Sequence, residues 1–218
     1  MLAPGLFTDV VADGAERTLI GTGRTAGALT GSADSGSTDD PQRPGLSTVV
    51  HKPGRELDEP KELLLGFLDY YRSVIIRKID GLTDAELRTS RLPSGWTPLE
   101  LLKHLAYMER RWLRWGFRGE QLPDPRGDED QAGRWYAGSG DTAASLIAEL
   151  HAVGEQTRAI ASAAELADTS TPGGRFSDND PRSLPTLAWI LTYVLQEYAR
   201  HAGHLDVARE LIDGTTGE

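Results

Sequence analysis

The sequence predicts an all-α fold, a four-helix bundle with a low-complexity N-terminal extension. Four long stretches carry apolar residues three and four positions apart, which is the spacing of amphipathic helices. No stretch shows a convincing strand pattern, and the segments between the helices are rich in glycine, proline and acidic residues. Long amphipathic helices without strands favour a bundle whose core is formed by their apolar faces.

Composition excludes several classes of function. The chain has 218 residues, a formal net charge of -10 and no cysteine. Its length predicts one domain, or one domain with an appendage, and its acidic balance argues against a nucleic-acid partner. Without cysteine there is no protein thiol nucleophile, so any thiol chemistry needs a thiol from a cosubstrate. No apolar run reaches the ~20 residues of a membrane span, and no signal peptide is evident, so we expect a cytoplasmic protein that does not contact a membrane.

Residues 1–57 differ from the rest of the chain. They include the stretch GTGRTAGALTGSADSGSTDDPQRPG, which has too few large apolar residues to form a core. We expect a disordered or loosely packed extension there, followed by a helical domain over residues 58–214. The glycine spacing does not predict a phosphate loop, because no Gly-Lys-Ser/Thr follows. The change in composition near His51 also raises the hypothesis of a natural start at Val49 or Val50, since valine codons can start bacterial genes.

The first helix is predicted over residues 59–80, where Asp58 can cap it and Gly81 ends it. A capping box formed by Thr83 and Glu86 then opens a short helical turn. The apolar face of the first helix consists of Leu64, Phe67, Leu68, Tyr71, Ile75 and Ile79.

The second helix has a clear start, with Thr97 as N-cap, Pro98 at the first position and Glu100 completing a capping box. It is predicted to end near Phe117. His104 lies beside its apolar seam and can face the interior of the bundle. The seam consists of Leu101, Leu105, Met108, Trp112 and Trp115. The arginines of this helix are expected to form a solvated face: Arg110, Arg111 and Arg114.

The third helix is predicted over residues 142–166, capped by Asp141. The fourth is predicted over residues 184–213, capped by Ser183 with Pro185 in its first turn. One face of the fourth helix is a continuous seam that is apolar at both ends and polar in the middle: Leu187, Ile190, Val194, Glu197, His201, His204, Ala208 and Leu211.

The polar middle of this seam predicts a metal site. A carboxylate and two imidazoles on a buried face cost several kcal/mol unless something satisfies them, and a metal ion would do so. Glu197 and His201 are one turn apart and can reach a single ion, and His104 is the natural third ligand. Three ligands from two helices leave positions for water or substrate, as in catalytic sites. These ligands suit zinc in the first place, and also nickel, iron, cobalt or manganese.

Other interpretations of these residues remain open. His104 can be a core histidine bonded to a backbone carbonyl, and Glu197 with His201 can be a simple helix pair. His204 is a candidate general base, but it can also hydrogen-bond a ligand or replace Glu197 as one. His51 and His151 are expected on the surface.

From about Pro60 to Gly214 the chain resembles the DinB-like superfamily, and most closely an uncharacterised, largely actinobacterial branch of it. The matching stretches are ELLLGFLDYYRSVIIRKIDGLTDAELR, WTPLELLKHLAYMERRW and LAWILTYVLQEYARHAGHLDVARELIDG, and EYARHAGHLD is the most specific part. The resemblance implies a four-helix bundle that holds a divalent metal through residues matching His104, Glu197 and His201. Glutamate at the first position of the last pair is similar to the mycothiol-dependent maleylpyruvate isomerases, which share the fold.

This superfamily includes transferases and isomerases that use mycothiol, bacillithiol or glutathione. The first hypothesis is therefore a metalloenzyme that activates a low-molecular-weight thiol or water towards a small electrophile, as an S-transferase, isomerase or hydrolase. The alternatives are a non-catalytic module that binds a metal or small ligand, and a structural dimer with histidines at its interface. A homodimer is the expected assembly in either case, since dimers dominate soluble homo-oligomers.

Overall fold

The computed structural model describes residues 51–176 and 184–217, and their fold is all-α, as predicted. The described residues contain isolated β-bridges but no strand. The helical segments are α1 (Pro60–Ile79), α2 (Asp84–Leu87), α3 (Pro98–Arg110), η1 (Arg111–Phe117), α4 (Ala143–Ser162) and α5 (Leu187–Asp213). No helix in the described part of the chain is long and apolar enough to cross a membrane. Most of the expected extension, residues 1–50, lies outside the described residues.

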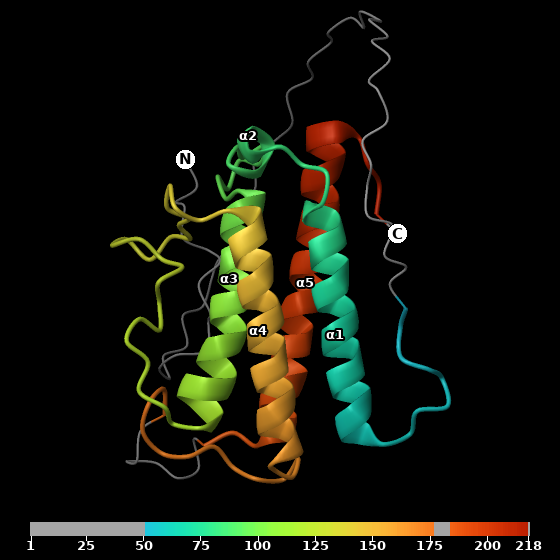
Figure 1. Cartoon of the computed structure of the whole chain (residues 1–218), viewed down its shortest axis with the longest axis vertical. Helices are drawn as coiled ribbons and strands as arrows, with labels where there is room; N and C mark the ends of the chain where they lie inside the picture. Colours follow the sequence, from blue (N-terminus) through green and yellow to red (C-terminus); the bar gives the residue numbers. More distant parts are fainter. Residues whose placement is uncertain (1–50, 177–183, 218) are drawn as a thin grey trace, which may run out of the picture.

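The four long helices stand side by side along the long axis of the molecule, an arrangement compatible with the predicted bundle (Figure 1). Helix α1 packs against α5 and α4, and α3 packs against α4 and α5. Each helix turns its apolar face inward, so that the core lies between them. Its fully buried residues include Leu68, Ile75, Leu101, Leu105, Met108, Leu150, Val194 and Leu205.

The two predicted capping boxes are confirmed. The Thr97 hydroxyl accepts a hydrogen bond from the backbone N–H of Glu100 at 3.3 Å, and the Glu100 carboxylate accepts one from the N–H of Thr97 at 2.9 Å. The box at Thr83 and Glu86 has the same reciprocal pattern. Because Thr97 fixes where α3 begins, it also fixes which face of α3 carries His104.

The other predicted helix starts are wrong by one to three residues. The N-caps are Glu59 and Thr142 instead of Asp58 and Asp141, and α5 begins after Thr186. Residues 184–186 are not helical because the backbone there pairs with the preceding loop: the carbonyl of Pro185 accepts from the N–H of Ser170 at 2.9 Å, and a β-bridge pairs Thr186 with Thr169. The predicted cap Ser183 lies outside the described residues. Helix α4 also ends four residues before the predicted Leu166.

The second predicted helix reaches Phe117, but its last seven residues form a π-helix. The N–H of Arg118 accordingly donates to the carbonyl of Leu113, five residues earlier, at 3.0 Å. The wider turn of a π-helix changes which residues face the core. Arg111 is completely buried, so the expected solvated arginine face is wrong for this residue. Trp115, predicted in the core seam, is only half-buried.

The predicted seam of α5 is buried from Leu187 to His201 and again at Ala208. His204 is half-buried, and Leu211 is 52 % exposed. Leu205, which is not part of the predicted seam, is fully buried and joins Ala208 on the buried face. The difference follows from helix geometry, since 3.6 residues per turn carry a strict seven-residue repeat around the helix by ~20° in each heptad.

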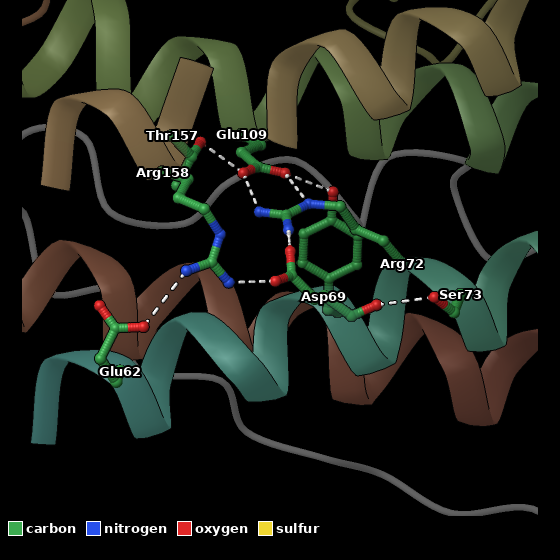
Figure 2. A network of polar contacts seen from close by, with 8 residues as sticks. Glu62, Asp69, Arg72, Ser73, Glu109, Thr157 and Arg158 are labelled. Carbon is green, nitrogen blue, oxygen red and sulfur yellow. Dashed lines mark hydrogen bonds and ion pairs between the residues drawn. The ribbon is translucent and has the colours of Figure 1, made fainter. Parts of the chain in front are cut away.

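A buried polar cluster joins all four long helices (Figure 2). Its centre is Glu109 of α3, which is fully buried. The carboxylate accepts hydrogen bonds from Arg72 of α1, from the Thr157 hydroxyl of α4 at 2.5 Å and from the Tyr198 hydroxyl of α5 at 2.6 Å. Burial and the negative charge of Glu109 raise the pKa of Tyr198 well above its usual value, so the tyrosine stays protonated and donates.

Candidate metal centre

The three residues predicted as metal ligands meet between α3 and α5. His104, Glu197 and His201 are all buried, with side chains that are at most 3 % exposed. One potential ligand atom from each residue lies within 4.8 Å of the others, so the group could hold a metal ion. His51 and His151 are exposed, as expected.

His104 is held by the carboxylate of Asp128, which is not among the predicted site residues. Its Nδ1 lies 3.0 Å from Oδ2 of Asp128, which belongs to the long loop after η1 and is fully buried. Burial alone would raise the pKa of Asp128, but the hydrogen bond with His104 and the charge of Arg111 lower it. The aspartate is therefore ionised and accepts a hydrogen bond from Nδ1–H of His104, and the neutral ring then has its lone pair on Nε2, where a metal ion could bind.

Burial also keeps His201 neutral. It lowers the pKa of His201 to about 4, although the neighbouring Glu197 opposes this effect. The buried Nε2 of His201 lies 3.3 Å from a Glu197 oxygen, but it has no hydrogen-bond partner among the described residues. A buried nitrogen with no partner is costly in a folded protein unless it binds something outside the chain.

Glu197 supplies the negative charge of the group. Burial would raise its pKa, but the neighbouring His201 and the positive charge of Arg200 lower it, so the carboxylate is ionised at neutral pH. Arg200 donates to Oε2 of Glu197 at 2.7 Å from a side chain that is 45 % exposed. The group thus combines a charged carboxylate with a neutral His201 ring, the protonation states in which these side chains bind metals.

His204 stands outside the group of three and contacts His201. The two Nδ1 atoms are 3.2 Å apart, a hydrogen-bond distance that requires one ring to donate and the other to accept. Burial lowers the pKa of His204 as well, and the positive charge of Arg200 adds to this effect.

Two indole rings line the histidines. Trp135 stacks on His104, with ring centroids 4.2 Å apart, and approaches His201 edge-on at 5.3 Å. Trp96 lies 6.2 Å from His204 and 6.3 Å from Trp135. Both tryptophans are half-buried and form an aromatic lining beside the histidines.

A family model for mycothiol S-transferases matches residues 63–214. The chain belongs to this family. The predicted resemblance to the DinB-like superfamily is confirmed, because the mycothiol S-transferases are a DinB-like family. No curated protein matches the chain. The match begins inside α1 and ends at Gly214, the C-cap of α5, so the mycothiol S-transferase region includes the whole candidate metal centre.

Proposed function

We propose that this protein is a metal-dependent S-transferase that joins the thiol of mycothiol, or a thiol like it, to a small electrophile. His104, Glu197 and His201 are the proposed metal ligands. The observation that carries the proposal is the convergence of their ligand atoms within 4.8 Å in a buried site, where Nε2 of His201 has no hydrogen-bond partner among the described residues. The family match supplies the class of cosubstrate.

The donor set suits a divalent ion of intermediate hardness. Two imidazole nitrogens and one carboxylate oxygen favour zinc, and they are also acceptable to nickel, iron, cobalt and manganese. Bound there, such an ion would lower the pKa of a thiol and make the thiolate available at neutral pH. Three protein ligands leave room in the coordination sphere for a sulfur that does not come from the protein, which has no cysteine.

The proposed transfer forms a sulfur–carbon bond. In a substitution, the thiol proton passes to solvent, and the leaving group departs from carbon with the electron pair of the broken bond. In an addition to a polarised double bond, the electron pair of the π bond moves onto the neighbouring carbon, which then takes up the thiol proton. Trp96 and Trp135 would flank the bound sulfur and limit the access of water that would compete as a nucleophile.

For His204 we propose a supporting role. If His201 binds the ion through Nε2, its Nδ1 keeps a hydrogen and donates it to Nδ1 of His204 at 3.2 Å. His204 then carries its own hydrogen on Nε2, which can donate but not accept. The geometry therefore favours His204 as a hydrogen-bond partner of a ligand over His204 as a general base, two of the three roles that the sequence left open.

The test is elemental analysis of purified wild-type protein beside His104→Ala, His201→Ala and His151→Ala. We expect about one metal ion per chain in the wild type and in the exposed control His151→Ala, and a loss of metal in the other two variants. A wild-type protein that stays metal-free after titration would overturn the metal centre.

Turnover is the second stage of the test. We expect the metal-loaded protein to conjugate mycothiol to a chromogenic electrophile faster than glutathione or bacillithiol. Stoichiometric metal with no turnover for any thiol would instead indicate a non-catalytic binding module.

We also propose that the protein is a cytoplasmic homodimer. A low-molecular-weight thiol stays reduced in the cytosol, where such a cosubstrate is available. Light scattering gives the mass in solution. His201→Ala should lose metal without changing that mass, whereas a change of mass with the metal retained would place the histidine at a subunit interface.

A further inference from the structure

We propose that Asp128 is a positioning residue for the metal centre: held by Arg111, it fixes the ring of His104 so that Nε2 faces the ion. This inference rests on the proposed function, because it assumes that His104 is a ligand. It assigns a role in metal binding to the long loop between η1 and α4, which contains none of the predicted ligands.

The first support is the bond between Asp128 and His104. The 3.0 Å contact joins Oδ2 of a fully buried carboxylate to Nδ1 of a buried ring. A carboxylate can only accept, so the ring must donate from Nδ1 and present its lone pair on Nε2. Carboxylates that accept from a metal-binding histidine in this way select its tautomer and raise its basicity.

The second support is the partner of Asp128 on its other side. Nη1 of Arg111 donates to Oδ1 of Asp128 at 2.5 Å, and both side chains are fully buried. Burying an ion pair is expensive, and apolar residues of similar volume often serve stability as well or better. In this pair, Arg111 holds one carboxylate oxygen of Asp128 and the other oxygen accepts from the ring of His104. The buried ion pair therefore fits a role in metal binding as well as in folding.

The third support is that the same loop contacts His104 a second time. The backbone carbonyl of Asp128 accepts from the N–H of Tyr136 at 2.8 Å, and a β-bridge pairs Glu129 with Trp135. This short hairpin returns Trp135 to the face of His104, where the two rings are stacked at 4.2 Å. One contact fixes the edge of the ring and the other fixes its plane, so the ring cannot turn its Nε2 away.

The test compares metal affinity in Asp128→Asn, Asp128→Ala and the control Asp124→Asn. Asp124 is an exposed carboxylate of the same loop, so its variant removes the same charge without touching the centre. Zinc affinity is measured by competition with a chromophoric chelator, and the cobalt-loaded proteins are compared by their visible spectra. Removal of such a partner typically weakens metal binding roughly 10–100-fold. We expect a loss of this size in Asp128→Asn, a larger one in Asp128→Ala, altered cobalt bands in both, and wild-type values in Asp124→Asn.

Unfolding of the metal-free proteins separates positioning from simple stabilisation. If Asp128 only stabilises the loop, its variants will unfold more easily but keep wild-type affinity and cobalt spectra, and the inference is wrong. If the wild type binds no metal at all, the proposed function fails first.

A second measurement needs no variant. Long-range proton–nitrogen spectra of the zinc-loaded wild type should show the hydrogen of His104 on Nδ1. A hydrogen on Nε2 would overturn the assignment even if the variants fail to fold.

Discussion

The buried cluster around Glu109 predicts a large and specific loss of stability on mutation. Replacing Glu109 by alanine leaves the guanidinium of Arg72, whose side chain is 6 % exposed, without its main anionic partner. Burial alone would lower the pKa of Arg72, but the charge of Glu109 raises it above its normal value, so this arginine stays charged in the wild type. Breaking a buried ion pair by removing one partner costs about 3–5 kcal/mol.

The assays are urea unfolding, which gives the free energy of unfolding, and thermal unfolding, which gives the melting temperature. Both are followed by tryptophan fluorescence and circular dichroism in the presence of a chelator, so that metal binding does not contribute. In a domain of this size each kcal/mol corresponds to about 2–4 °C, so the melting temperature of Glu109→Ala should fall by roughly 6–20 °C. Glu62→Ala is the matched control, because Glu62 and Arg158 form the half-exposed edge of the same network at 3.3 Å (Figure 2). An exposed pair of this kind contributes at most about 1 kcal/mol.

A double-mutant cycle identifies the source of the loss. Removing Arg72 from the Glu109→Ala protein also removes the unpaired charge, so the double variant should be more stable than the sum of the single losses predicts, by about 1–3 kcal/mol. A Glu109→Ala protein no less stable than Glu62→Ala, or a cycle without coupling, would refute the claim that this ion pair is desolvated.

Three further predictions concern stability. Gly154→Ala should destabilise the protein, because the new Cβ would lie 3.0–3.1 Å from the Arg72 side chain, which is held by Glu109. Gly203→Ala in α5, where nothing lies within 4 Å of the new Cβ, should instead stabilise the protein by roughly 0.5–1 kcal/mol in urea unfolding. Thr97→Ala should cost about 1 kcal/mol in the same assay, through loss of the capping box. In metal-free protein, the low pKa of His201 should make the free energy of unfolding highest above pH 6.5 and about 3 kcal/mol lower at pH 4, because the unfolded chain binds the proton more readily. His201→Asn should reduce this pH dependence in acid titrations followed by circular dichroism.

The parts of the structure that sequence could predict are those set by local rules. A capping box requires particular residues at fixed spacing, so Thr97 and Glu100 predict the start of α3 correctly. Side chains one turn apart share a helix face in any α-helix, which brings Glu197 and His201 together without knowledge of the fold. His104 could be added because its phase on α3 follows from the same start.

The parts that sequence missed depend on contacts between distant segments. Asp128 is one of several acids in a polar loop, and only the closed loop shows which of them reaches His104. Arg111 was predicted on a solvated face because charged side chains are seldom fully buried without a partner, and its partner Asp128 lies 17 positions away in sequence. The π-helix is also absent from a pattern that assumes 3.6 residues per turn throughout.

Two of the buried carboxylates, Glu109 and Glu197, show how a structural polar group differs from a candidate ligand. Each oxygen of Glu109 accepts two hydrogen bonds, Oε1 from Arg72 and Thr157, and Oε2 from Arg72 and Tyr198. That carboxylate is satisfied by the protein alone and has no capacity left for a ligand. Glu197 lies instead beside a buried imidazole nitrogen that the described residues leave without a hydrogen-bond partner. This unsatisfied nitrogen supports the proposed metal site, because a bound ion would give it the partner that the described residues do not.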